Sequence, residues 1–160
     1  MDQLRHLFET LRFSNVETFI ASGNVIFDST FKNTRALEKK IGDYLQDALG
    51  YKVVTFIRAA TELAAIAHYK PFSDAELEAE GNSLYIGFLA DSPGDDVQQK
   101  LRLLTTRVDD FHIYKRELYW LCRKQVSESE VSGALLEKTL GMPATLRNST
   151  TVRKIASKYS

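Results

Sequence analysis

Hydrophobic residues at helical spacing predict six helices along the chain. Leu4, Leu7 and Leu11 recur every three or four residues, and Asp2 before them is a residue type that often caps helices. The chain is therefore expected to open with an amphipathic helix over residues 4–11. The same pattern predicts five more helices, at residues 34–49, 61–66, 93–104, 127–140 and 149–159. Gly50 is expected to end the second helix.

Short runs rich in Val, Ile, Phe and Tyr predict the strands. Ser22, Gly23 and Asn24 join the first two runs, and their tolerance of positive φ in a tight turn predicts a β-hairpin. A second hairpin is predicted around residues 115–117, and residues 69–81 are predicted to be a loop with room for one helical turn. The predicted strands lie at residues 16–21, 25–27, 52–58, 83–89, 111–113 and 118–122.

The order of these elements predicts an α+β fold. The first half reads helix, strand, strand, helix, strand, and the second reads strand, helix, strand, strand, helix. Each order is that of a ferredoxin-like βαββαβ unit that lacks one strand. The halves lie at about residues 1–70 and 82–160. Because no low-complexity linker separates them, we expect them to pack together as a single domain over residues 1–160.

The composition is that of an ordinary globular protein. Of the 160 residues, 44% are hydrophobic and 26% are charged. The single cysteine, Cys122, excludes an internal disulfide and fits a reducing compartment. The first residues lack the apolar run of a signal peptide, and no apolar stretch approaches membrane-spanning length. We therefore expect a cytoplasmic protein without a membrane partner.

The charges sum to zero but are segregated along the chain. Residues 71–99 contain seven acidic residues and neither Lys nor Arg, whereas the chain after Glu137 contains basic residues and no acid. Such segregation is usual for two solvated faces, yet it makes the C-terminal stretch the better place for an anionic ligand. The basic residues of this stretch are Lys138, Arg147, Arg153, Lys154 and Lys158.

One group of residues within the C-terminal stretch suits an anion. Asn148 or Ser149 can cap a helix, and the first amides of that helix, together with Arg147, Thr151 and Lys154, could hold a phosphate or a carboxylate. The alternative is an ordinary capped helix with solvated basic side chains. Both interpretations stay open.

The turn at Ser22, Gly23 and Asn24 is a second possible binding site. A turn with positive φ can point successive N–H groups outward as an anion-binding nest. A plain hairpin turn accounts for the same residues, and turn chemistry favours it.

Metal and cofactor sites are not expected. His6, His68 and His112 are far apart and show no metal-ligand spacing with one another or with Cys122. Cys122 alternates with Trp120 on a predicted strand, which favours a buried, unreactive thiol. The phosphate-binding loop, the dinucleotide-binding glycine pattern and the nucleophile elbow are all absent from the sequence, and we expect no cofactor.

Several aromatic residues lie on predicted strands, as they do in RNA-recognition domains with a ferredoxin-like sheet. Those strands carry little positive charge, so core packing accounts for them better, and we do not expect nucleic acid to be a partner. The residues are Tyr85, Phe111, Tyr114 and Tyr119.

Three separated motifs resemble one family. They are FIASGNVIF at residues 19–27, RELY at 116–119, and LEKTLGMPATLRN at 136–148, the last followed by Thr151, Val152 and Lys154. Their order is similar to that of the widespread bacterial family catalogued as domain-of-unknown-function family 1697. This resemblance implies no activity, because the family has none assigned.

The sequence departs from the family pattern at its start. Relatives begin with an apolar strand and a glycine-rich loop, and nothing here corresponds to them. We therefore expect a truncated reading frame in which the first strand of the N-terminal half is missing. Loss of a central strand leaves its neighbours without partners, which predicts a homodimer through an exposed sheet edge. Ser149 also replaces a tryptophan of the family, and Glu130 and Val131 replace a Lys-Leu pair.

Three functions remain open from the sequence. The leading hypothesis is a protein that binds a small anionic ligand near Arg147, Asn148, Thr151 and Lys154. The second is an enzyme that uses the same anion site, which needs a general base within reach of Arg147. The third is a nucleic-acid-binding protein, whose affinity would fall steeply with salt.

Overall fold

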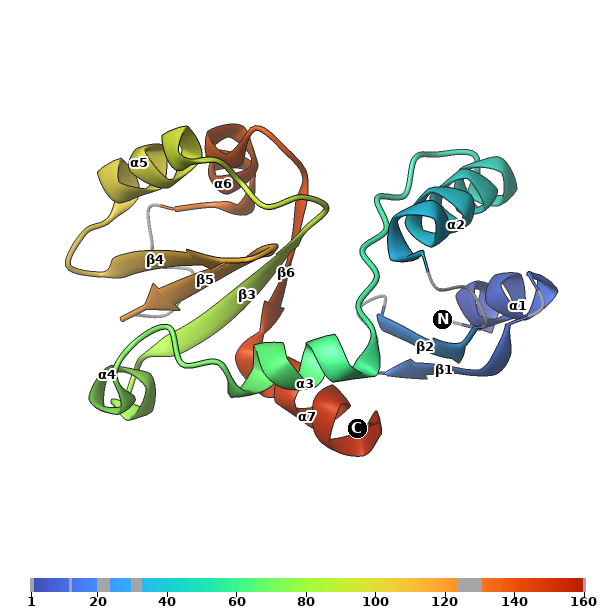
Figure 1. Cartoon of the computed structure of the whole chain (residues 1–160), viewed down its shortest axis with the longest axis horizontal. Helices are drawn as coiled ribbons and strands as arrows, with labels where there is room; N and C mark the ends of the chain where they lie inside the picture. Colours follow the sequence, from blue (N-terminus) through green and yellow to red (C-terminus); the bar gives the residue numbers. More distant parts are fainter. Residues whose placement is uncertain (1, 12, 20–23, 30–32, 124–130, 160) are drawn as a thin grey trace. The chain divides into compact units, whose positions relative to one another are not determined.

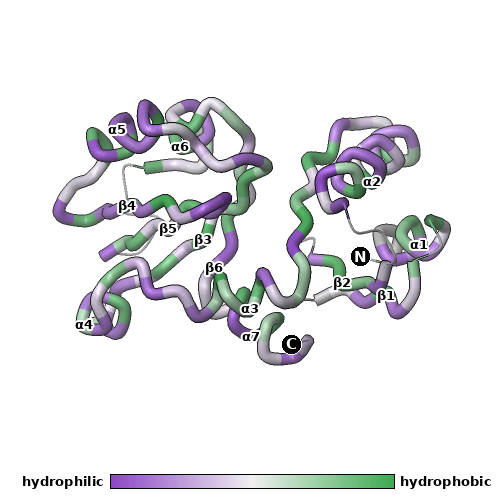
Figure 2. The backbone as a smooth tube through the Cα atoms, in the orientation of Figure 1, coloured by the Kyte–Doolittle hydropathy of each residue, from purple (hydrophilic) through white to green (hydrophobic). Residues whose placement is uncertain are grey.

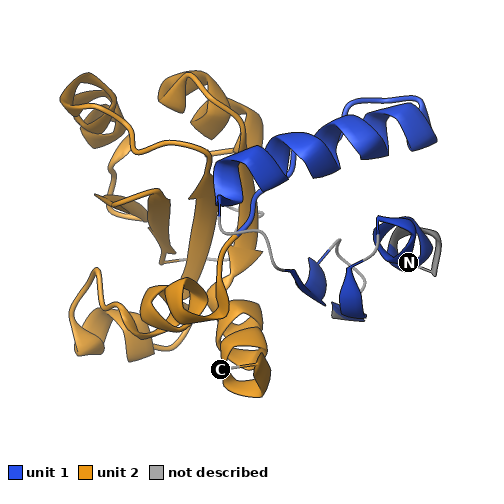
Figure 3. Cartoon of the chain, turned by 45° about the vertical axis from the view of Figure 1, so that its right-hand side comes forward, with its two compact units in different colours: residues 1–57 blue, residues 58–160 orange. Residues whose placement is uncertain are grey.

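The computed structural model describes residues 2–11, 13–19, 24–29, 33–123 and 131–159. The chain divides into two compact units, Met1–Ile57 and Arg58–Ser160, shown in Figure 3. Both units contain helices and antiparallel strands, so the expected α+β class is confirmed. None of the helices in the described ranges is long and apolar enough to cross a membrane.

The N-terminal unit contains a helix, a hairpin and a second helix. Helix α1 (Asp2–Thr10) precedes β1 (Ser14–Phe19) and β2 (Asn24–Asp28), which pair antiparallel, and α2 (Thr34–Leu49) follows. All four elements agree with the prediction. The core of this unit consists of Phe8, Val16, Leu37, Ile41 and Leu45, each at most 6% exposed.

Helix α2 has the ends that its sequence predicts. The side chain of Asn33 accepts a 3.1 Å hydrogen bond from the amide of Ala36, which satisfies one of the free amides of the first turn. Gly50 adopts φ of +81° and donates its amide to the carbonyl of Gln46. The left-handed conformation explains why glycine ends this helix.

The predicted strand at residues 52–58 is wrong. This segment has no ladder partner, and none of the described residues makes a backbone–backbone hydrogen bond with residues 52–56. Val53 and Ile57 still pack against the core of the N-terminal unit, and the amide of Ile57 donates to the carboxylate of Glu38 at 2.8 Å. The apolar residues of this segment therefore make core contacts without forming a strand.

The C-terminal unit begins with two helices and continues as a sheet with helical connections (Figure 1). Its elements in chain order are α3 (Ala60–His68), α4 (Asp74–Glu78), β3 (Ser83–Leu89), α5 (Asp95–Leu104), β4 (Asp109–Tyr114), β5 (Glu117–Cys122), α6 (Gly133–Leu140), β6 (Ala144–Asn148) and α7 (Ser149–Tyr159).

The sheet of the C-terminal unit has the strand order β4-β5-β3-β6, with all neighbours antiparallel. Helices α5 and α6 cover one face, and α3 and α7 lie on the other (Figure 1). Figure 2 shows hydrophilic and hydrophobic residues alternating along the turns of α5, as expected for a helix with one buried side.

Both faces of β5 are buried, because every residue of this strand is covered. Leu118, Trp120 and Cys122 point to the α5 and α6 side, and the intervening residues point to the α3 and α7 side. Cys122 is fully buried, which confirms its prediction as a core residue. The indole of Trp120 donates a 2.8 Å hydrogen bond to the buried carboxylate of Asp109.

One strand of this unit was missed, and two helices begin later than predicted. Strand β6 was missed because its sequence, ATLRN, contains only two apolar residues, Ala144 and Leu146. Helix α6 begins at Gly133 behind the cap Ser132, so the predicted start near residue 127 is too early; residues 127–130 lie outside the described ranges. Helix α5 begins at Asp95 behind Gly94, two residues after the predicted start.

Candidate functional site

Arg147 and Asn148 form the last two residues of β6, directly before α7. The guanidinium of Arg147 is partly buried and donates hydrogen bonds to the Thr145 hydroxyl at 2.7 Å and to the Leu146 carbonyl at 2.9 Å. Burial lowers the pKa of Arg147 below its usual value, because a cation is less stable away from water. A buried cation of this kind gains more from a bound anion than a solvated one does.

Asn148 acts as a cap in the structure. Its side-chain oxygen accepts a 2.9 Å hydrogen bond from the amide of Thr150, in the first turn of α7. The other two predicted residues lie on α7, where Thr151 is partly buried and Lys154 is exposed. Arg147 and Asn148 therefore lie at the end of β6, Thr151 lies in the first turn of α7, and Lys154 lies one turn further along that helix.

The predicted turn site is separate from this region in the chain. Ser22 and Gly23 lie outside the described residues, and Asn24 is the first residue of β2 in the N-terminal unit. The nest at this turn stays a prediction.

A row of side chains crosses the sheet on the α3 and α7 side. Arg147 pairs with Ile86, Ile86 with Tyr119, and Tyr119 with His112. Because neighbouring strands lie about 4.8 Å apart, the backbones of Arg147 and His112 are roughly 14 Å apart. His112 is thus too distant to act as a general base at Arg147. His6 lies on α1 of the other unit, and His68 lies at the end of α3.

An aromatic group covers the β4 end of this row. The hydroxyl of Tyr69 lies 2.7 Å from Nε2 of His112, and the Tyr69 ring stacks on Tyr114 with centroids 4.2 Å apart. Tyr119 lies beneath, 1% exposed, and its hydroxyl has no hydrogen-bond partner among the described residues. Burial, and then the negative charge of Glu117, raise the pKa of Tyr119, so this hydroxyl stays protonated.

A buried ion pair lies on the same face, where Glu117 pairs with Tyr114 in the ladder of β4 and β5. Arg58 and Glu117 are joined at 3.0 Å, with side chains 4% and 6% exposed. Arg58 also donates to the carbonyl oxygens of Leu89 at 2.7 Å and Arg116 at 3.2 Å. Burial raises the pKa of Glu117 despite the attraction of Arg58, because the desolvation of a carboxylate exceeds that attraction. These partners give the pair a structural role.

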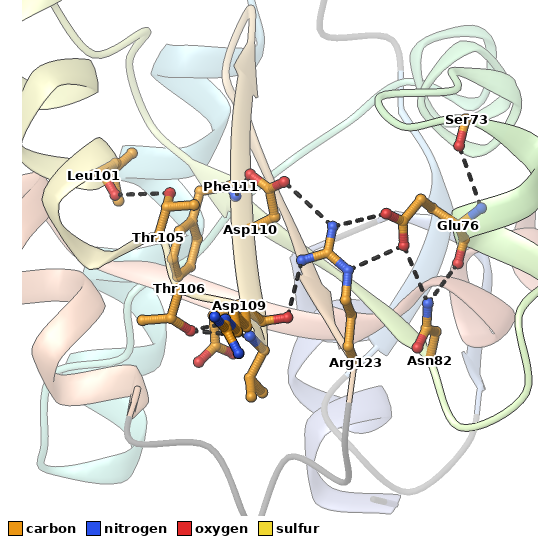
Figure 4. A network of polar contacts seen from close by, with 12 residues as sticks. Ser73, Glu76, Asn82, Leu101, Thr105, Thr106, Asp109, Asp110, Phe111 and Arg123 are labelled. Atoms are coloured by element: carbon orange, nitrogen blue, oxygen red, sulfur yellow. Dashed lines mark hydrogen bonds and ion pairs between the residues drawn. The ribbon is translucent and has the colours of Figure 1, made fainter.

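Arg123 holds α4 against the sheet, as Figure 4 shows. Its guanidinium contacts both oxygens of Glu76 at 3.0 Å and Asp110 at 3.5 Å. The hydrogen bond from Arg123 lowers the pKa of Glu76. Sequence reasoning missed this network, because its members are far apart in the chain and no local pattern connects them.

A cavity of about 260 Å³ lies at the end of α3 in the C-terminal unit. Most of its lining residues are polar or charged, and Ala67 and Leu77 are its aliphatic residues. Sequence reasoning nominated Arg153 only as one of several basic residues. The lining residues are Ala67, His68, Tyr69, Lys70, Asp74, Leu77, Glu78 and Arg153.

In the described part of the chain, no three His, Cys, Asp or Glu side chains group as metal ligands. The basic side chains of α7 are Arg153, Lys154 and Lys158.

The family model described as "Protein of unknown function (DUF1697)" matches residues 1–119. The chain belongs to the DUF1697 family. A solved structure of a conserved bacterial protein from Streptococcus pneumoniae is similar, with a TM-score of 0.69 and 20% sequence identity over 100% of this chain and 88% of that chain. At this identity the similarity shows that the DUF1697 chain shares the fold. Comparison with curated proteins found no match.

Proposed function

We propose that the protein binds a small anionic ligand near Arg147, Asn148, Thr151 and Lys154. The observation that carries the proposal is the partly buried guanidinium of Arg147, whose pKa is lowered by burial. Two of its hydrogen bonds go to uncharged oxygens, those of Thr145 and Leu146. A phosphate or carboxylate could form charge-assisted hydrogen bonds with this guanidinium.

The surrounding chain supports an anion for two further reasons. No acidic residue follows Glu137 in the sequence, so no carboxylate from this stretch competes for Arg147. Helix α7 is eleven residues long and starts directly after Asn148, so the positive end of its dipole adds to the field of Arg147. Lys154 is exposed and adds charge without needing to be desolvated.

Titration with inorganic phosphate tests the proposal. Phosphate should raise the melting temperature in proportion to the logarithm of its concentration, as expected for a ligand of the folded state. Arg147→Gln should weaken the apparent affinity about tenfold, and Lys154→Ala by a few-fold. Lys100→Ala, an exposed change on α5, serves as the control. Equal phosphate affinity in all four proteins would contradict the proposal.

We also propose a ferredoxin-like arrangement for the C-terminal unit. Its element order of β3, α5, β4, β5, α6 and β6, together with the strand order β4-β5-β3-β6, supports this assignment. An experimental structure in which β6 does not pair with β3 would refute it.

We further propose that the chain forms a homodimer through an exposed edge at residues 52–56. Among the described residues, none makes a backbone–backbone hydrogen bond with this β-prone segment, and Val54 is 46% exposed. A lysine at an edge opposes strand pairing, so Val54→Lys should shift the protein to monomer in light scattering. Leu103→Lys, which replaces an 85% exposed residue on α5, should leave the mass unchanged. A monomeric parent protein would refute this proposal.

A further inference from the structure

The cavity at the end of α3 is lined by charges of both signs. Lys70 and Arg153 are positive, Asp74 and Glu78 are negative, and the sum is zero when His68 is neutral. A simple anion would be attracted by two of these groups and repelled by the other two, and the same holds for a simple cation. The lining therefore favours a ligand that carries both charges.

Two of the four charges are already matched to each other. Lys70 and Asp74 form an ion pair at 2.9 Å. Asp74 lies four residues after Lys70, and their mutual attraction reduces the field that either group presents to a ligand. Glu78 attracts Lys70 more weakly than Asp74 does.

The other two charges line the same cavity without touching. Within the described part of the chain, neither Arg153 nor Glu78 makes an ion pair or a hydrogen bond. They come from different elements, Arg153 from α7 and Glu78 from α4. The cavity that both residues line has a volume of about 260 Å³, which equals that of roughly nine water molecules at 30 Å³ each.

Part of the wall of the cavity is apolar. Ala67 and Leu77 contribute small and medium aliphatic groups, and Tyr69 contributes an aromatic residue. Such a surface accommodates a short aliphatic side chain and disfavours a second polar group, which would lose its hydration there.

We infer that this cavity binds a free α-amino acid with a small aliphatic side chain. The carboxylate is held by Arg153, whose planar guanidinium forms two parallel hydrogen bonds to a carboxylate. The ammonium group is held by Glu78, and the side chain contacts Ala67 and Leu77. This inference goes beyond the proposed function, because its cation is Arg153 and its ligand carries no net charge.

Three small probes test the inference by isothermal titration. L-alanine contains both charges, propionate lacks the amine and ethylamine lacks the carboxylate. L-alanine should bind with a Kd of about 1 mM, and each single-charge probe at least about tenfold more weakly. No heat from L-alanine, or equal binding of propionate and L-alanine, would overturn the inference.

Exposed side chains allow matched variants that retain the fold. Arg153→Met and Glu78→Gln should each weaken L-alanine binding about tenfold or more. Lys158→Met on the same helix and Glu80→Gln near α4 are the controls and should bind normally. Unchanged L-alanine affinity in Arg153→Met and Glu78→Gln would overturn the assignment of this cavity.

The proposed anion site near Arg147 and the inferred amino-acid site at Arg153 can be refuted independently of each other. Arg147→Gln should leave L-alanine binding intact while it weakens phosphate binding. Loss of L-alanine binding in Arg147→Gln, with Arg153→Met unaffected, would overturn the cavity as the amino-acid site.

Discussion

The carboxylate of Glu117 lies 3.0 Å from the guanidinium of Arg58, and both side chains are almost completely buried. Arg58 is the first residue of the C-terminal unit, whereas Glu117 begins β5, the strand that is buried on both faces. This contact fixes the start of the unit to its sheet. Trp120 is the single tryptophan and lies on the same strand, so its fluorescence reports the unfolding of this unit.

Removing Arg58 should cost more stability than removing the whole pair. Arg58→Met leaves the buried Glu117 carboxylate without its main partner, and we expect a loss of about 3–5 kcal/mol in urea unfolding. The double variant Arg58→Met with Glu117→Leu should recover most of that loss, because no buried charge remains. A double variant as unstable as the single one would contradict this explanation.

Two tyrosine hydroxyls should have opposite effects on stability. Tyr119→Phe removes a buried hydroxyl that has no partner among the described residues, and should stabilise the unit by about 1 kcal/mol. Tyr69→Phe removes the hydroxyl that contacts His112 and should destabilise it by about 1 kcal/mol. Urea unfolding followed by tryptophan fluorescence measures both. A destabilised Tyr119→Phe protein would show that its hydroxyl binds a partner in solution.

The Glu76 contact should make stability depend on pH. The pKa of Glu76 is below its usual value of 4.5 in the folded protein, so its stabilising effect is complete above that pH and is lost as pH falls through the folded value. Glu76→Gln should therefore lower stability at pH 7 and have little effect near about pH 2. The exposed Glu80→Gln change is the control. A deficit of equal size at both pH values would contradict the role of charge.

The stability of the protein should depend on the hydrogen bond between the indole of Trp120 and the carboxylate of Asp109. Trp120→Phe removes the 2.8 Å hydrogen bond and part of a buried ring, and we expect a loss of about 3 kcal/mol in thermal unfolding followed by circular dichroism. Asp109→Asn keeps an acceptor oxygen for the indole and should cost about 1 kcal/mol. The order of the two losses is the test, and an inverted order would contradict the proposed contact.

Local signals in the sequence predict most elements of this fold. The Asn33 cap and Gly50 stop of α2 are local features, so the sequence alone locates that helix. Residues 52–58 show the limit of such reasoning. A β-prone pattern shows only that the side chains can pack, whereas a strand also needs a ladder partner from elsewhere in the chain. Strand β6 is the converse case. Its residues form a strand because they pair with β3, which lies more than fifty residues away in the chain, and no local pattern reports that pairing.

The sequence predicted which residues belong to the candidate site better than it predicted how they are arranged in space. Arg147 was nominated because acids are absent from the last stretch of sequence, but its partial burial depends on the sheet. Asn148 was expected as a possible cap and serves as one. The neighbours of Arg153 in the cavity come from α3 and α4, so no spacing in the sequence could have connected them.

The position of β3 inside the sheet affects how the chain folds during synthesis. This strand is made first among the four, yet both of its partners, β5 and β6, come later, and β6 ends only at Asn148. At about 5–20 residues per second, a ribosome needs several seconds to extend the chain from Leu89 to Asn148. During that interval the apolar side chains of Ile86, Phe88 and Leu89 lack their final cover, so the nascent chain presents a binding segment for chaperones before the sheet closes.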